Sequence, residues 1–330
     1  WEKVYATIHD GLKTASPIKA GLFKWAERVA IDVYRDKRAG KKSSSFLMAQ
    51  YALADKLIIQ KVQETLGAEN SDVYHVGGAA FSEEINEFFL AFGINTIQGF
   101  GLTEFFPAAM GYDTNGYPGV CGPIIPMCEV RISEEGEIQL KGNMCMTGYY
   151  NNPEATAECF TEDGWFKTQD IGEIITEKLA GETFSYIAIT DRIKDLIIAA
   201  GGKNISPQQI EILFGEELLI EQFVTIGEGR KFISALIVPN LIQLEEYCRK
   251  NKITFSSLEE LIKRPEIIKL YETIIDERTQ SLGQVEKIKK FTLLLNELTQ
   301  ENGELTPTMK LKRSFINEKY QELIDKMYAE

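Results

Sequence analysis

Apolar side chains recur at helical spacing over two long segments early in the chain. In residues 18–35 and 46–66 they fall three and four positions apart, which predicts two helices that each bury one face. The basic, serine-rich stretch Arg38–Ser45 lies between them and predicts a loop. The chain opens at Trp1, without a methionine and within an ordinary helical pattern, so we expect it to be part of a longer protein.

The pattern after residue 72 predicts a layer in which strands and helices alternate. The apolar run Val73–Val76 reads as a short strand, and Ser82 is a good N-cap for the helix that follows. The apolar side chains of that helix share one face: Ile85, Phe88, Phe89 and Phe92. Ile94–Gln98 predicts another strand, which runs into a loop at Gly99–Glu104. This order of elements predicts an α/β layer over about residues 1–115.

From residue 116 to 191 the sequence pattern changes to short runs in which apolar and polar residues alternate, separated by glycines and prolines. Glu137–Lys141 and Phe184–Thr190 are two such runs, and they predict a region rich in antiparallel strands. A chain of 330 residues is long for one small core, so we expect two domains. We place the boundary near Asp191–Lys194, which gives domains 1–191 and 192–330.

The second domain is predicted to begin with strands and to end in helices. Strands are expected at Leu196–Ala200, Val224–Ile226 and Phe232–Val238, and the remainder is expected to be largely helical. The stretch Ser206–Gln209 supplies an N-cap serine, a proline at the first helical position and a glutamine for a capping box, so a helix should start there.

Composition excludes several classes of site. The net charge of −13, spread along the sequence, argues against nonspecific nucleic-acid binding, because such a surface repels polyphosphate. Only His9 and His75 are available, which excludes a histidine-rich metal site; His75 lies in an apolar run, where we expect a buried structural histidine. No apolar stretch approaches the ~20 residues that span a bilayer, and we expect no signal peptide.

Cysteine usage indicates the compartment. The five cysteines are odd in number and form no close metal-type pairs, so we interpret them as free thiols in a reducing cytoplasm: Cys121, Cys128, Cys145, Cys159 and Cys248.

Three polar segments could carry chemistry, although each has a simpler explanation. In Gly99–Glu104, Thr103 and Glu104 could hold a phosphate and its Mg²⁺, but the segment alone favours a solvated turn. Asp170, expected at the end of a strand, could accept both hydroxyls of a ribose or cap a turn, and Arg192 could contact a phosphate or belong to a solvated linker. Lys310 could reach out from a mobile loop or sit in a basic surface segment.

The joint occurrence of several motifs, in order, resembles the acyl-adenylate-forming superfamily of acyl-CoA synthetases, luciferases and peptide-synthetase adenylation domains. Four stretches match motifs of that family. Phe100–Glu104 matches Tyr-Gly-x-Thr-Glu, with Phe in place of Tyr, and Gly148–Thr156 matches Gly-Tyr-x-Asn-x-Pro-Glu-x-Thr. Gly164–Gly172 matches Gly-Trp-Phe-x-Thr-x-Asp-x-Gly, and Asp191–Glu211 matches the Arg-x-Lys-Asp and Gly-Gly-x-Asn-Ile blocks. The resemblance covers essentially the whole chain and outweighs the simpler explanations.

Two stretches are similar to the long-chain fatty acyl-CoA synthetase branch. These are Gly77–Ala80 and Glu301–Thr308, and Met309 stands where other branches place a glycine before the catalytic lysine. The Ser/Thr/Gly-rich phosphate loop of the family does not occur in these residues, and family order places it before Trp1. We therefore expect the 330 residues alone to be inactive.

The resemblance implies a fold and a set of site residues. The fold would be the C-terminal part of a large α/β domain with a β-rich subdomain, followed by a small mobile α+β domain. Lys310, Thr103 and Glu104 would act on the phosphates, with Mg²⁺ on Glu104. The other binding residues would be Gly78 and Ala79 at the adenine, Phe100 and Gly101 beside it, Asp170 and Arg192 at the ribose and phosphate, Lys194 at the hinge, and Gly201 and Gly202 along the pantetheine path.

The implied reaction joins a long-chain fatty acid to CoA at the expense of ATP, with Mg²⁺ bound, through an acyl-AMP intermediate. Two alternatives stay open: transfer of the acyl group to a carrier protein, and a noncatalytic acyl- or nucleotide-binding homologue. Chain-length preference and oligomeric state are open too. A fatty substrate is compatible with peripheral attachment of a cytoplasmic protein to the inner membrane face.

Overall fold

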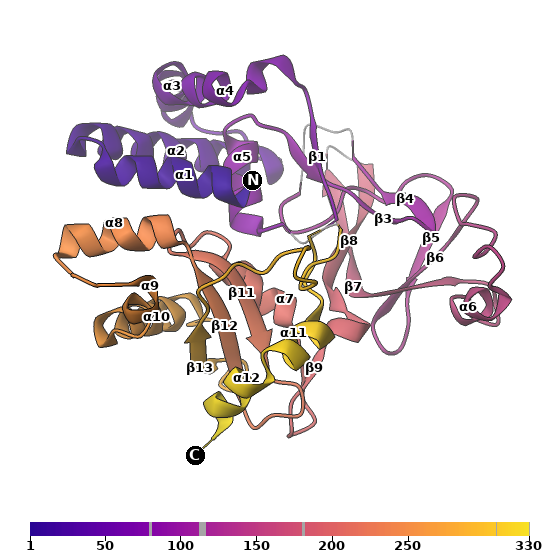
Figure 1. Ribbon diagram of the computed structural model, residues 1–330. Coiled ribbons are helices and arrows are strands. Elements are labelled where there is room, and N and C mark those ends of the chain that lie inside the picture. The colour runs from indigo at the N-terminus through magenta and orange to yellow at the C-terminus, as the bar shows by residue number, and fades with distance from the viewer. Residues whose placement is uncertain (79–80, 112–116, 180–181, 308, 330) are drawn as a thin grey trace. The chain divides into compact units, whose positions relative to one another are not determined.

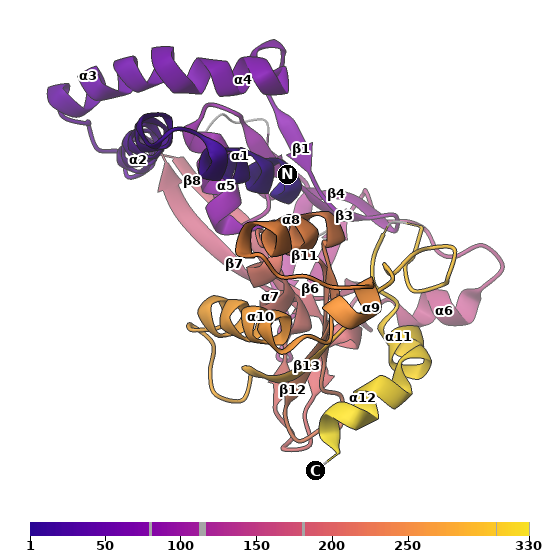
Figure 2. The same cartoon turned by 60° about the vertical axis from the view of Figure 1, so that its left-hand side comes forward.

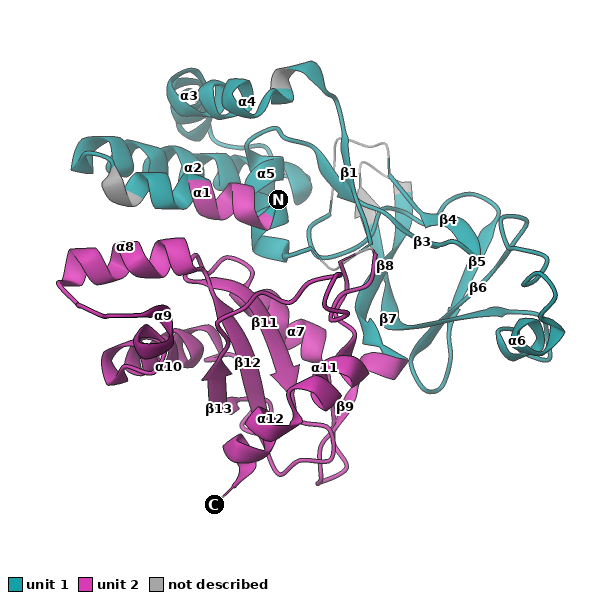
Figure 3. Ribbon diagram, in the orientation of Figure 1, with its two compact units in different colours: residues 1, 8–193 teal, residues 2–7, 194–330 magenta. Residues whose placement is uncertain are grey.

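The computed structural model describes residues 1–78, 81–111, 117–179, 182–307 and 309–329. Contacts between backbone positions divide the chain into two compact units (Figure 3). Trp1 and Ile8–Ile193 form the first, and Glu2–Thr7 with Lys194–Glu330 form the second. The division falls between Ile193 and Lys194, beside the boundary expected at 191/192. Both units mix helices with sheets, so the α/β plus α+β class expected from the sequence is confirmed.

The N-terminal helices follow the apolar pattern. They are α1 (Glu2–Thr14), α2 (Pro17–Arg38), α3 (Ser45–Ala54), the π-helical turn η1 (Asp55–Ile59), α4 (Gln60–Leu66) and the short 3₁₀ turn η2 (Ala68–Asn70). Ser16 and Ser44 cap α2 and α3, because their hydroxyls accept backbone N–H groups three residues on, at 3.4 and 3.1 Å. The helices expected at 18–35 and 46–66 are confirmed.

A parallel pair of short strands carries the first glycine-rich segment. β1 (Tyr74–Val76) and β2 (Thr96–Gln98) flank α5 (Glu83–Ala91), whose predicted cap Ser82 accepts the N–H of Ile85 at 3.4 Å. The predicted apolar face of α5 is buried, as expected. His75, however, is exposed, so the expectation of a buried histidine was wrong. Successive side chains of a strand point to opposite faces, and His75 lies opposite its half-buried neighbours Tyr74 and Val76.

The segment Gly99–Glu104 is a second correction. It was expected to be a loop, but Phe100–Leu102 forms strand β3, which pairs antiparallel with β4 (Phe105–Ala109). Leu102 faces Phe105 across this hairpin, so Thr103 and Glu104 are its two turn residues. Gly101 is required here, since a Cβ would lie 2.6 Å from the Phe106 ring and 3.2 Å from the carbonyl of Phe105.

The region expected to be rich in antiparallel strands is a four-stranded antiparallel sheet. Its order is β5 (Cys128–Ile132), β6 (Glu137–Gly142), β7 (Phe166–Leu179) and β8 (Glu182–Arg192), with α6 (Pro153–Glu158) in the β6–β7 connection. One apolar cluster joins this sheet to the β3–β4 hairpin: Phe100, Phe105, Ala108, Ala109, Cys121, Ile138, Leu140, Phe166 and Ile187. The turn at Glu104 and the strand that carries Asp170 therefore rest on a shared core.

The second unit is a three-layer arrangement around a short sheet (Figures 1 and 2). The sheet order is β11 (Ile220–Ile226), β12 (Ile233–Pro239) and β13 (Ile288–Leu293). One face packs on α7 (Pro207–Glu211), η4 (Ile212–Phe214), α8 (Leu241–Asn251), α9 (Leu258–Leu261) and α10 (Pro265–Arg278). The other face packs on α11 (Arg313–Lys319) and α12 (Gln321–Tyr328). Because both faces are covered, β12 is buried at every position, and its run of apolar residues is interrupted only by Ser234.

Strand β13 was not expected, since the last part of the chain was predicted to be largely helical. Lys289 and Lys290 interrupt its apolar pattern and are exposed, as charged residues on an edge strand often are. The predicted start of α7 is confirmed, because the Ser206 hydroxyl accepts the Gln209 N–H at 3.1 Å. The strand expected at Leu196–Ala200 is shorter, with β9 at Ile197–Ile198 paired to β10 (Asn204–Ile205).

Candidate active site

Asp170 is a buried carboxylate on the long β7–β8 hairpin. It was expected at the end of a strand, but it lies inside β7, directly opposite Arg192 of β8. Its side chain is 6% exposed, and the Nε of Arg192 donates a hydrogen bond to its Oδ1 at 2.9 Å. Burial, and then the charge of Asp170, raise the pKa of the neighbouring Cys121 thiol to about 12. The predicted ribose-binding pair therefore forms a direct contact.

The backbone around Asp170 is fixed by two side chains. The Thr168 hydroxyl accepts the N–H of Asp170 at 3.0 Å and donates to the carbonyl of Ile138 at 2.7 Å. Gln169 adopts a left-handed conformation with φ of 61°, and its N–H donates to the buried carboxylate of Glu137 at 2.9 Å. A left-handed residue is costly unless its surroundings hold it. Glu137 and Thr168 supply that support, and the sequence did not indicate Glu137 as part of the site.

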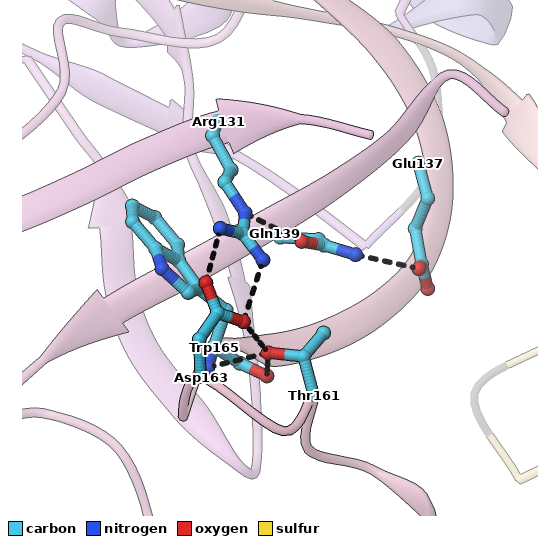
Figure 4. A network of polar contacts seen from close by, with 6 residues as sticks. All are labelled: Arg131, Glu137, Gln139, Thr161, Asp163 and Trp165. Carbon is cyan, nitrogen blue, oxygen red and sulfur yellow. Dashed lines mark hydrogen bonds and ion pairs between the residues drawn. The ribbon is translucent and has the colours of Figure 1, made fainter. Parts of the chain in front are cut away.

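A polar network extends from Glu137 to Trp165, the tryptophan of the motif Gly164–Gly172 (Figure 4). Gln139 donates to Glu137 at 3.4 Å and accepts from the Nε of Arg131 at 2.7 Å. Arg131 also binds both carboxylate oxygens of Asp163, at 2.6 and 3.0 Å, and its guanidinium lies 4.5 Å from the centre of the Trp165 ring. These contacts explain Trp165 as a structural member of the motif Gly164–Gly172.

Glu104 is held in the β3–β4 turn by a partner that lies 45 residues along the chain. The hydroxyl of Tyr149 donates to its Oε1 at 2.7 Å, and the N–H of Met146 donates to its backbone carbonyl at 2.7 Å. The hydrogen bond from the Tyr149 hydroxyl to Glu104 raises the pKa of Tyr149 to about 12, with smaller contributions from burial and from the charge of Glu104. Thr103 is exposed beside Glu104. Sequence reasoning missed Tyr149, although it lies in a matched motif.

Of the predicted adenine-side residues, Gly78 follows β1, and Phe100 and Gly101 begin β3. The N–H of Gly99 donates to the carbonyl of Val76 at 2.7 Å, so the segment after β1 lies beside the start of the β3–β4 hairpin. Gly78 has φ of 87°, which favours glycine. Phe100 is 6% exposed and belongs to the apolar cluster, so its contact with adenine stays a prediction. Ala79 lies outside the described residues.

Four predicted residues belong to the second unit. Lys194 lies in the 3₁₀ turn η3 (Ile193–Asp195). Gly201 and Gly202 form the exposed turn between β9 and β10, and a Cβ at either position would meet no atom within 4 Å among the described residues. Gly202 has φ of 77°. Open space of this kind allows another chain or a ligand to approach the backbone.

Lys310, the fourth of these residues, is exposed near the base of a closed loop. Leu305 and Leu311 pair across the base of this loop, the Thr306 hydroxyl accepts the Lys310 N–H at 3.0 Å, and the N–H of Thr306 donates to the Lys310 carbonyl at 2.8 Å. Met309, directly before the lysine, has φ of 63°. This left-handed backbone explains why a glycine suits the position in other branches. Both the base of this loop and the backbone of Lys310 are hydrogen-bonded, and the mobility of the loop stays a prediction.

Glu304 is the buried residue that holds the base of this loop in place. Its carboxylate is buried and accepts hydrogen bonds from Lys319 at 2.6 Å, from the Thr299 N–H at 3.0 Å and from the Tyr320 hydroxyl at 3.1 Å. Burial raises the pKa of Glu304, but these hydrogen bonds outweigh burial and hold it below its ordinary value. The N–H of Lys312 closes the loop by donating to the Glu304 carbonyl at 2.8 Å.

The carboxylate of Glu104 suits a Mg²⁺ ion that takes most of its other ligands from water and from the phosphates of a bound substrate. Among the described residues, no group of three or more His, Cys, Asp or Glu side chains could hold a metal ion. Mg²⁺ needs fewer protein ligands, since it keeps waters and binds substrate phosphates beside one or two carboxylates. Glu104 fits that requirement: Tyr149 occupies Oε1, and within the described part of the chain Oε2 has no hydrogen-bond partner. All five cysteines are free, and no described helix is long and apolar enough to cross a membrane.

Family models match two stretches of the chain. Residues 38–150 match the model described as "AMP-binding enzyme", and residues 194–330 match "AMP-binding enzyme C-terminal domain". The chain is 32% identical to the long-chain-fatty-acid–CoA ligase FadD15 of Mycobacterium bovis over 330 residues, covering 99% of this chain and 53% of that protein. It is 27% identical to the long-chain-fatty-acid–CoA ligase ACSBG2 of Mus musculus, covering 99% and 51%. The chain thus spans about half the length of the curated relatives it matches.

Solved structures share the fold at lower identity. The adenylation domain of a carboxylate reductase from Mycobacterium chelonae matches with a TM-score of 0.62 at 22% identity, over 92% of this chain and 46% of that one. A didomain of carboxylic acid reductase from Segniliparus rugosus, in complex with AMP, matches with a TM-score of 0.60 at 22% identity, over 92% and 40%. At this identity the likeness establishes the fold.

Proposed function

This chain belongs to the AMP-binding enzyme family, and from that premise we propose that it forms part of a long-chain fatty acid–CoA ligase that produces AMP. The observation that carries the nucleotide-binding half is the buried Asp170, fixed by Arg192 and by a supported left-handed backbone. The names of the relatives support the acyl and CoA half.

The first half-reaction joins two anions. A carboxylate oxygen of the fatty acid attacks the α-phosphorus of MgATP, the bond to the bridging oxygen breaks, and pyrophosphate leaves with the electron pair. Positive charge must be placed where negative charge grows on the phosphoryl oxygens. We assign that role to Lys310, whose loop is closed and anchored by Glu304. Thr103 would contact a phosphate oxygen, and Glu104 would bind the Mg²⁺ that accompanies ATP.

The remaining residues bind and orient the nucleotide. Asp170 would accept the two ribose hydroxyls, since a carboxylate offers several lone pairs, and Arg192 would contact the ribose and phosphate. Gly78 and Ala79 would lie along the adenine, with Phe100 and Gly101 beside it. In the second half-reaction, CoA thiolate attacks the acyl carbonyl and AMP leaves. Lys194 would be the hinge about which the second unit turns, and Gly201 and Gly202 would lie along the pantetheine path.

Two other functions differ in the fate of the adenylate. An acyl-AMP ligase would pass the acyl group to a carrier protein in place of CoA. A noncatalytic homologue would bind ligands and form no adenylate, but such a protein has no need of Lys310. Retention of Thr103, Glu104, Asp170 and Arg192 beside Lys310 favours the enzyme.

Product analysis separates these functions. Family order places the phosphate loop before Trp1, so the assay uses the chain joined to that N-terminal portion, which we call the extended protein. With MgATP and palmitate it should release pyrophosphate, and addition of CoA should yield palmitoyl-CoA and AMP. The 330 residues alone should release none. Thioester on a carrier protein with none on CoA would support the second function, and absence of pyrophosphate from the extended protein would support the third.

A further inference from the structure

The motif Gly148–Thr156 has no role in the chemistry assigned above, yet its residues build one well-defined loop. The Thr156 hydroxyl accepts the Tyr149 N–H at 2.9 Å and donates to the Asn152 carbonyl at 2.9 Å. Asn152 caps α6 by accepting the Ala155 N–H at 3.1 Å. The N–H of Asn152 donates to the Tyr149 carbonyl at 3.2 Å, so the loop holds both the N–H and the carbonyl of Tyr149.

Two further positions of the motif accept backbone conformations that most residues avoid. Gly148 has φ of 150°, and a Cβ there would lie 2.8 Å from the Thr156 side chain. Asn151 is left-handed with φ of 52°, which asparagine tolerates better than most residues. The sequence of the motif therefore specifies the loop geometry, and Tyr149 is the member whose side chain leaves the loop for a distant partner.

That partner is Glu104, the carboxylate assigned to Mg²⁺. Tyr149 donates to Oε1 at 2.7 Å, and the backbone of Glu104 is tied to the same segment by the Met146 N–H at 2.7 Å and by pairing of Phe105 with Cys145. The carboxylate of Glu104 is therefore held by Tyr149 of the motif loop, and its backbone is held by Met146, just before that loop. A hydrogen bond to one carboxylate oxygen restricts the rotation of the group and so limits the directions in which the other oxygen can point.

We propose that Tyr149 is a positioning residue: its hydroxyl binds one oxygen of Glu104 so that the other is presented to the Mg²⁺ of MgATP. The proposal rests on the function proposed above, because it requires Glu104 to be a metal ligand. Groups that orient a metal-binding carboxylate from behind change metal affinity or activity by roughly 10- to 100-fold when they are removed. The tyrosine acts through Glu104 and contacts neither the metal nor the nucleotide.

The chain provides a matched control for this role. Tyr149→Phe removes one hydroxyl and keeps the ring, while Tyr150→Phe makes the same change at the next residue, which is 93% exposed. In the extended protein we expect Tyr149→Phe to weaken Mn²⁺ binding in the presence of a nonhydrolysable ATP analogue by about 10-fold, measured by electron paramagnetic resonance. Tyr150→Phe should bind Mn²⁺ like the wild type. The Mg²⁺ concentration for half-maximal pyrophosphate release should rise with Tyr149→Phe, and excess Mg²⁺ should restore the rate.

Glu104→Gln distinguishes failure of this inference from failure of the proposed function. If Glu104→Gln weakens Mn²⁺ binding and Tyr149→Phe does not, the positioning role is wrong and the metal role of Glu104 stands. If neither variant changes Mn²⁺ binding, Glu104 is no metal ligand and both ideas fail. In the Glu104→Gln background, Tyr149→Phe should add no further loss, because the two residues act as one unit. Independent, additive losses would contradict the inference.

Discussion

The β7–β8 hairpin of the first unit and the Lys310 loop of the second place opposite charges by a similar backbone arrangement. In each, the residue before the functional side chain is left-handed and is not glycine: Gln169 with φ of 61° and Met309 with φ of 63°. In each, a buried glutamate accepts a backbone N–H nearby, Glu137 from Gln169 and Glu304 from Thr299.

The two regions differ in how far the functional group is buried. Asp170 lies within a sheet and is almost fully covered, while the side chain of Lys310 is exposed on a surface loop. Under the role proposed for Asp170, a fixed carboxylate paired with Arg192 would be set in place to accept the two ribose hydroxyls. Under the role proposed for Lys310, the lysine acts in only one half-reaction and must be able to leave, which an exposed side chain on a surface loop allows. The difference predicts that substitutions in the hairpin affect nucleotide binding, whereas Lys310 affects a single chemical step.

The largest effect is expected for Lys310→Ala in the extended protein. Loss of one preorganised charge at the phosphoryl oxygens should slow acyl-AMP formation by ~10²–10³-fold. Pyrophosphate release in a single turnover, without CoA, measures this step. Lys312→Ala is the matched control, since Lys312 is exposed two residues away and contributes only its backbone N–H to the loop. Equal slowing by both variants would indicate that general surface charge, and not Lys310, promotes the reaction.

Asp170→Ala should weaken ATP binding by roughly tenfold to a hundredfold, because ribose hydroxyls left without an acceptor cost ~1–3 kcal/mol. Titration calorimetry on the extended protein measures the affinity. Glu173→Ala, an exposed change on the same strand, should leave it unchanged. An unaltered affinity in Asp170→Ala would remove this carboxylate from the nucleotide site.

Glu304→Gln tests the anchor of the Lys310 loop through pH. The native pKa of Glu304 is lowered, so its contribution to stability is fully present above its ordinary value of 4.5 and is lost as the pH falls through the lowered native pKa. The substitution should lower the free energy of unfolding of the second unit by about 2 kcal/mol at pH 7, as for a hydrogen bond to a charged group. Its effect should shrink at acidic pH. Glu301→Gln, an exposed neighbour, should have no effect at any pH.

A smaller effect on stability is expected when a β-branched residue replaces one of the two residues with left-handed backbone. Gln169→Val and Met309→Val should each lower the free energy of unfolding by about 1–2 kcal/mol, because a β-branched residue fits left-handed backbone poorly. Gln169→Gly and Met309→Gly should not lower it. Chemical denaturation of the four variants measures this contrast. Equal stability of the valine and glycine variants would mean that the left-handed backbone is not a constraint at these sites.

Local patterns predicted the elements whose signals lie within a few residues. Ser82 caps α5, whose apolar face begins a few residues later, and Ser206 caps α7 in the same way. Both helices could be predicted because their signals lie close together in the sequence. Strand β3 was missed because Gly101 reads as a loop residue, and its extended form depends on pairing with β4. β13 was missed because its lysines hide the apolar pattern of an edge strand.

The candidate site was predictable only in part for the same reason. Motif matches selected Glu104, Asp170 and Lys310, but some of the side chains that hold them and their neighbours lie far away along the chain. Tyr149 lies 45 residues from Glu104, and Glu137 lies 32 residues from Gln169. Only Met309, in place of a usual glycine, hinted at the left-handed backbone before Lys310. No periodicity in a single sequence encodes such distant contacts.

The most direct test of the division of labour between the two regions bypasses the first half-reaction. Pre-made palmitoyl-AMP and CoA are supplied to the Lys310→Ala variant of the extended protein, and palmitoyl-CoA is measured in a single turnover. We predict a rate close to that of the wild type, because the charge of Lys310 is needed only while the α-phosphate is attacked. A rate reduced as strongly as that of acyl-AMP formation would contradict this assignment and would make the lysine a structural residue of its loop.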